Sequence, residues 1–114
     1  MQPELVTVVE TRAFSSAAKD RMRPEEIDAL IGLLAASPEA GDIIQGTGGI
    51  RKVRFALQGR GKSKGVRVVY YFHNDTMPVF LLTVFAKNEK DNLSMAERNA
   101  LAKVARTLRD SYGE

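Results

Sequence analysis

The sequence predicts a small α+β domain in which helices pack on one face of a mainly antiparallel sheet. Three strand-like runs between residues 50 and 86 are joined by short loops, which is typical of an antiparallel meander. Two segments with helical periodicity precede these runs and one follows them. The 114 residues suit a single domain that spans residues 1–114.

The first half of the chain predicts one strand and two helices. Leu5–Glu10 is short and rich in β-branched residues, which favours a strand. Thr11–Arg21 has apolar residues at helical spacing and predicts a short helix. A stronger helix begins at Pro24, because proline suits the first helical position and two acidic residues follow it. Ser37 and Pro38 end this helix.

The second half predicts the meander and a final helix. Ile50–Leu57 alternates between apolar and cationic residues, as a half-buried strand does. Gln58–Gly65 is a basic, glycine-rich loop, and Val66–His73 is the next strand. Val79–Ala86 is apolar on both faces, which predicts a central strand. Ser94 begins the last helix, because a glutamate three residues later completes a capping box.

Positive charge is concentrated in the middle of the chain. Residues 51–90 hold nine lysines and arginines and only two carboxylates, whereas residues 1–50 are net acidic and the whole chain carries +3. A concentrated positive surface attracts polyanions and accelerates their binding. Nucleic acid is therefore the first partner that the sequence indicates.

Several classes of function are excluded or disfavoured by composition. The absence of cysteine rules out disulfides, thiol nucleophiles and thiolate metal sites. His73 is the only histidine, so a histidine pair for acid–base work is impossible and a transition-metal site is disfavoured. The chain has neither a signal-peptide pattern nor a run of about 18 apolar residues. We expect a cytoplasmic protein with no metal, no cofactor and no membrane contact.

A relaxed phosphate-loop pattern spans Ala56 to Ser63. Such a loop must open a helix, whose N-terminus holds the phosphates. The residues after Gly65 resemble a strand instead, so a charged hairpin loop is the better interpretation.

The strands predict one cationic cluster. Lys52 and Arg54 lie two residues apart and share a face, and Arg67 projects near them if the neighbouring strands pair. Lys87, which follows the third strand, would complete the group. Such a cluster can hold a phosphodiester and stabilise charge on a pentavalent phosphorus. The alternative is a solvated face that only binds.

Tyr70 and Tyr71 are adjacent on a strand, so their side chains point to opposite faces. The alternation places Tyr71 with Arg67 and His73, where its ring could stack on a base. Packing in the core is the alternative for either tyrosine.

Four blocks carry a family resemblance: GGIRKVRF at 48–55, GRGKSKGVRVVYYF at 59–72, FAKNEK at 85–90 and NLS at 92–94. They resemble the RelE/HigB family, and more closely its HigB branch. These proteins are toxins of type II toxin–antitoxin modules. The resemblance covers nearly the whole chain and includes the order of its elements.

The resemblance implies a RelE-like microbial RNase fold and a toxin that inhibits translation. It implies a metal-independent endoribonuclease that enters the 70S ribosome and cuts mRNA through attack of a ribose 2′-OH on the adjacent phosphate. It also implies a cognate antitoxin of helix-turn-helix type. The toxin would bind operator DNA only through this antitoxin.

The resemblance also assigns residues to roles. A phosphate-holding arginine of the family falls on Arg67. A second arginine falls on Lys87, which keeps the charge but loses the bidentate fork. A tyrosine that some members use falls on Leu93, so its role is absent or moved. The predicted catalytic set is Lys52, Arg54, Arg67, Lys87 and Lys90. The predicted RNA- and ribosome-binding set is Arg51, Arg60, Lys62, Lys64, Tyr71, His73 and Asn92.

Two other readings of the sequence stay open. The chain could be a catalytically inactive module of the same fold that still binds RNA, the ribosome or an antitoxin. It could also be a DNA-directed partner of phage origin.

Overall fold

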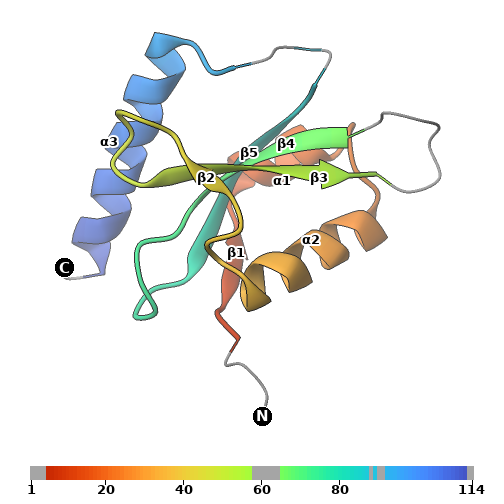
Figure 1. Ribbon diagram of the computed structural model, residues 1–114, viewed down its shortest axis with the longest axis horizontal. Helices are drawn as coiled ribbons and strands as arrows, with labels where there is room; N and C mark the ends of the chain where they lie inside the picture. Colours follow the sequence, from red (N-terminus) through yellow and green to blue (C-terminus); the bar gives the residue numbers. More distant parts are fainter. Residues whose placement is uncertain (1–4, 58–64, 88, 90–91, 113–114) are drawn as a thin grey trace.

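The computed structural model describes residues 5–57, 65–87, 89 and 92–112, which form one sheet and three helices (Figure 1). This arrangement confirms the predicted α+β class. The elements in chain order are β1 (Val8–Glu10), α1 (Arg12–Ala18), α2 (Pro24–Ala36), β2 (Asp42–Ile43), β3 (Ile50–Ala56), β4 (Gly65–Tyr71), β5 (Val79–Ala86) and α3 (Met95–Ser111).

The sheet is mainly antiparallel, as the sequence predicts. Its five strands lie in the order β1-β5-β4-β3-β2. Strands β3, β4 and β5 form the predicted antiparallel meander, and β2 extends it on the far side of β3. Strand β1 pairs with β5 in parallel, so the apolar strand β5 is internal to the sheet.

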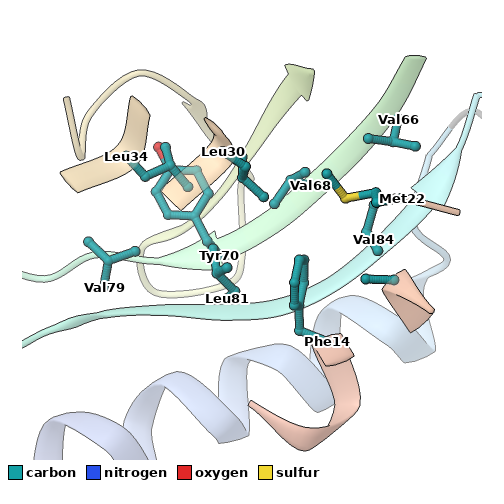
Figure 2. Close-up of a cluster of buried hydrophobic side chains, with 11 residues drawn as sticks. Phe14, Met22, Leu30, Leu34, Val66, Val68, Tyr70, Val79, Leu81 and Val84 are labelled. Atoms are coloured by element: carbon teal, nitrogen blue, oxygen red, sulfur yellow. The ribbon is translucent and has the colours of Figure 1, made fainter. Parts of the chain in front are cut away.

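The first core lies between one face of the sheet and helices α1 and α2 (Figure 2). Alternate residues of β4 project into it, together with residues from β5. All of its members are buried: Phe14, Ala18, Met22, Leu30, Leu34, Val66, Val68, Tyr70, Val79, Leu81 and Val84.

A second core lies on the opposite face of the sheet, and this corrects the expectation that all helices share one face. The other set of β4 residues, Val69 and Tyr71, is also apolar and also fully buried. Helix α3 covers them, with Ala105 completely buried at its centre. Figure 1 shows α3 (blue) and α2 (orange) on separate sides of the strands. Because β4 and β5 are apolar on both faces, one helical layer cannot bury them.

A bulge in β5 changes which of its alternating side chains face each core. Val69 pairs with Thr83, but Tyr70 pairs with Leu81, so Leu82 is an extra residue. Leu81 belongs to the core under α1 and α2, whereas Leu82 belongs to the core under α3. An extra residue of this kind leaves the ladder in register on both sides while it bends the strand.

The helix boundaries follow the capping signals in the sequence. The side chain of Thr11 accepts a hydrogen bond from the Phe14 amide at the start of α1. Pro24 is the first residue of α2, as predicted. Ser94 and Glu97 form the predicted capping box of α3. No helix in the described part of the chain is long and apolar enough to cross a membrane.

Four strand boundaries differ from the prediction. The first strand begins at Val8 rather than Leu5, and β3 ends at Ala56 rather than Leu57. Strand β4 begins at Gly65 rather than Val66 and ends at Tyr71 rather than His73. Strand β2 was not predicted, because two exposed residues carry no periodic pattern. Of the predicted basic loop Gln58–Gly65, all but the last residue lies outside the described residues.

Tyr70 ties the connection between α2 and β2 to the sheet. Its fully buried hydroxyl accepts a hydrogen bond from the Gly41 amide at 2.8 Å and donates one to the Pro38 carbonyl at 2.8 Å. The backbone of Gly41 lies so close to β3 that an added Cβ would meet the Lys52 carbonyl oxygen at 2.8 Å. Only glycine fits at this position without a shift of the backbone.

We predict that Gly41→Ala lowers the free energy of unfolding by about 1–3 kcal/mol, because the methyl group overpacks a site bounded by backbone. Gly32→Ala is the control, since an added Cβ on that exposed helical position meets nothing within 4 Å. We expect the control to raise stability by about 0.5–1 kcal/mol. Urea unfolding of both variants checks the prediction, and equal stabilities would contradict it.

We predict that Tyr70→Phe costs about 1–3 kcal/mol at neutral pH, because the buried Gly41 amide and the partly buried Pro38 carbonyl lose their partner. Burial raises the pKa of Tyr70, so the folded state favours the neutral phenol. The wild-type advantage is complete below the ordinary tyrosine pKa of about 10 and is lost as pH rises above it. Unfolding of both proteins between about pH 8 and pH 11 measures this difference. A constant difference across that range would count against the role of the hydroxyl.

Candidate functional site

The strand register brings three of the predicted cationic residues together. Arg54 and Arg67 are direct partners in the β3–β4 ladder, and Lys52 lies two residues from Arg54 on the same face. This is the face that α3 covers, because Ile50 and Val69, which share it, belong to the α3-side core. The cations therefore lie at the open end of that face, where the apolar residues of both strands stop.

An open pocket of about 570 Å³ collects these side chains. Lys87 enters it directly after β5, and Asn92 enters it shortly before α3. The pocket is thus built from strands β2, β3 and β4 and from the connections before β2 and after β5. Its lining residues are Ala40, Asp42, Lys52, Val53, Arg54, Arg67, Lys87 and Asn92.

A hydrogen bond joins the two sides of the pocket. The Lys52 Nζ donates to the Asn92 Oδ1 at 3.2 Å. Asn92 is itself placed by the next two residues, since Leu93 is buried in the α3-side core and Ser94 caps α3. The start of α3 therefore holds a polar side chain against the cationic strand.

The charge of the pocket is strongly unbalanced. Four cationic side chains line it, against one carboxylate from the described residues, that of Asp42. Arg54 and Arg67 lie directly opposite one another, and like charges in that position destabilise a sheet. The part of the chain that the structure describes offers no ion-pair partner to Arg54, Arg67 or Lys87. A site of this kind is suited to bind an anion that bridges several cations.

The remaining members of the predicted catalytic and binding sets lie in several places. Asn92 reaches the pocket. Lys90, Arg60, Lys62 and Lys64 lie outside the described residues.

Arg51 lies on the opposite face of the sheet from the pocket. It pairs with Tyr70, and its Nη1 donates to the Gly41 carbonyl at 2.7 Å and to the Glu39 carbonyl at 3.3 Å. Its guanidinium supports the connection that leads into β2, on the face of the sheet opposite Lys52 and Arg54.

Tyr71 is fully buried, which corrects its predicted role as a platform for a base. The apolar face under α3 needs a large side chain there, and the Tyr71 hydroxyl accepts a hydrogen bond from Arg109 at 3.0 Å. His73 is exposed, and its ring stacks on Tyr71 with 6.3 Å between the ring centroids. Tyr71 lies four residues beyond Arg67 along β4, or about 13 Å by strand rise. The two aromatic residues are therefore not part of the pocket.

Three lining residues were not among the predicted site residues: Ala40, Asp42 and Val53. Asp42 pairs with Lys52 across β2 and β3. A two-residue strand gives no signal that could have placed this carboxylate beside the cations. Within residues 5–57, 65–87, 89 and 92–112, no three His, Asp or Glu side chains group closely enough to hold a metal ion.

Comparison with known proteins assigns the chain to a family. A family profile described as the RelE toxin of the RelE/RelB toxin–antitoxin system matches residues 7–113. A solved structure of the Escherichia coli toxin RelE, an arginine-to-alanine double mutant in the free state, has the same fold with a TM-score of 0.53. The two chains are 18% identical, and the match covers 88% of this chain and 96% of that one. Because the profile covers nearly the whole sequence, the chain belongs to the RelE family of toxins from toxin–antitoxin systems.

Proposed function

We propose that this toxin is a ribosome-dependent endoribonuclease that cuts mRNA without a metal ion and so blocks translation in the cytoplasm. Toxins of the RelE family are endoribonucleases. The observation that carries the proposal is the convergence of Lys52, Arg54, Arg67 and Lys87 in one pocket with Asn92. The chain lacks a histidine pair, so cationic side chains must carry the electrostatic part of catalysis.

The proposed reaction forms a bond between the ribose 2′-oxygen and the adjacent phosphorus. The bond from phosphorus to the 5′-oxygen breaks, and the products are a 2′,3′-cyclic phosphate and a free 5′-OH. The 2′-OH gives up its proton as it attacks, and the departing 5′-oxygen takes one. Negative charge grows on the phosphoryl oxygens in the transition state, where fixed cations are most effective.

The geometry supports different roles for the cationic side chains of the pocket. Arg54 and Arg67 face each other across two strands, so a phosphate between them would relieve their repulsion. Lys87 follows β5 and approaches from the neighbouring strand, where it can stabilise the leaving 5′-oxygen. Lys52 is oriented by Asn92. Lys90 remains a proposed contributor that lies outside the described residues.

The proposed partners follow from the family and from the charge. A RelE toxin has a cognate antitoxin, and we propose one of helix-turn-helix type through which the toxin reaches operator DNA. The sequence blocks around residues 59–72 and 85–94 support a place in the HigB-like branch. We propose that ribosomal RNA is bound by Arg60, Lys62 and Lys64.

One experiment tests the proposal. The chain is expressed from an inducible promoter, with and without its neighbouring gene, and the 5′ ends of cellular mRNA are mapped. Growth arrest with cuts in phase with codons is expected. Arrest without cuts would indicate an inhibitor that only binds the ribosome, and no arrest would indicate an inactive module.

We predict that Arg67→Ala lowers the cleavage rate by about 100- to 1,000-fold, the usual cost of removing one group that stabilises the transition state. Arg67→Lys keeps the positive charge but not the bidentate guanidinium, so its cleavage rate should fall less than that of Arg67→Ala. Arg12→Ala is the control, because this exposed arginine begins α1 on the other side of the sheet. Cleavage of ribosome-bound mRNA and urea unfolding are measured for all three variants. Unchanged cleavage by Arg67→Ala would remove Arg67 from the site.

We predict that Lys62→Ala weakens ribosome binding and makes it less sensitive to salt. Each lost contact with an RNA phosphate lowers the slope of log K against log salt by about 0.7–0.9. Binding titrations at several salt concentrations check this, and the cleavage rate at saturating ribosome should remain near that of the wild type. An unchanged slope would exclude Lys62 from the phosphate contacts.

A further inference from the structure

Two pocket residues, Lys87 and Asn92, lie between β5 and α3, and Glu89, two residues after Lys87, forms an ion pair with Arg21. Arg21 follows α1, and its Nε and Nη2 donate to the two carboxylate oxygens of Glu89 at 2.8 and 2.6 Å. These residues are 68 positions apart in the sequence. The bidentate geometry fixes both the distance and the orientation of Glu89.

Arg21 is itself held in place. Its Nη1 donates to the Ala17 carbonyl oxygen in α1 at 2.7 Å. Helix α1 is in turn anchored to the sheet, because Phe14 and Ala18 are fully buried in the core beside β5. The guanidinium is therefore a rigid link between a packed helix and the connection that follows β5.

Glu89 is also hydrogen-bonded to the backbone beside Lys87. Its Oε1 also accepts a hydrogen bond from the Ala86 amide at 2.6 Å, and its own amide donates to the Ala86 carbonyl at 3.0 Å. Lys87 is the first residue inside the turn that these bonds close. Its place in the pocket depends on the geometry of that turn.

The ion pair is poorly placed to stabilise the whole fold. The side chains of Arg21 and Glu89 are 29% and 40% exposed, and ion pairs at such positions contribute about 1 kcal/mol or less. A small displacement of a catalytic group, by contrast, costs up to about 100-fold in rate. The structural effect of the pair is thus concentrated on the pocket.

We infer that Arg21 is a positioning residue: through Glu89 it sets the place of Lys87 in the cationic pocket. The catalytic consequence rests on the proposed nuclease function. The structural consequence does not, and the two are measured separately.

The first measurement is cleavage of ribosome-bound mRNA. Arg21→Ala should lower the rate by roughly 10- to 100-fold, with the melting temperature nearly unchanged. Arg21→Lys should restore part of the activity, since it keeps the charge but not the fork. Lys19→Ala is the matched control, because this exposed residue lies two positions away. A wild-type rate for Arg21→Ala would overturn the inference.

A double-mutant comparison separates positioning from general weakening of the fold. Arg21→Ala is combined with Lys87→Ala, which removes the group that Arg21 is inferred to place. The loss caused by Arg21→Ala should then be several-fold smaller than in the wild-type background. Equal losses in both backgrounds would mean that Arg21 acts through stability alone, and would overturn the inference.

The second measurement does not depend on catalysis. Hydrogen exchange followed by NMR reports on the amides of Ala86 and Glu89, which the turn protects. Both should exchange faster in Arg21→Ala and at the wild-type rate in Lys19→Ala. Unchanged exchange would overturn the inference whatever the nuclease data show. Faster exchange in a protein that cuts no RNA would instead overturn the proposed function and leave the structural role of Arg21 supported.

Discussion

The arrangement of the pocket depends on one unfavourable contact, the pairing of Arg54 with Arg67 across β3 and β4. Like charges in this position repel, and a sheet tolerates them only when the rest of the ladder holds the strands together. Strand β4 meets this condition because Val68 and Val69 are completely buried on its two faces. The two cores therefore hold the cations in a geometry that they would not adopt by themselves. A local conflict of this kind is expected at a functional site.

Much of the pocket could be predicted because strand periodicity is a short-range property. The alternation along β3 was enough to place Lys52 and Arg54 on one face, and the short loops of the meander brought Arg67 opposite them. Tyr71 shows the limit of the same reasoning. Alternation assigned it correctly to the face of Arg67, but only the three-dimensional structure shows that α3 buries that part of the face.

The second helical layer and the edge strand could not be predicted for a related reason. Both depend on how separate elements pack together, which the periodic pattern of each element does not specify. Helix α3 is amphipathic in any arrangement, so its sequence does not say which face of the sheet it covers. Asp42 enters the pocket only because β2 pairs with β3. Arg21 and Glu89 likewise look like ordinary surface charges until the fold brings them together.

The bulge at Leu82 has a consequence for how such chains diverge. The pairs on either side of it, Val69 with Thr83 and Tyr70 with Leu81, are already adjacent in β4. Loss of Leu82 would remove the bulge and leave the other residue pairs between β4 and β5 unchanged. An alignment of distant homologues can therefore gain or lose one position here while Lys87 still emerges at the same end of the sheet. The register of the sheet would survive such a change, whereas the α3-side core would lose the buried side chain of Leu82.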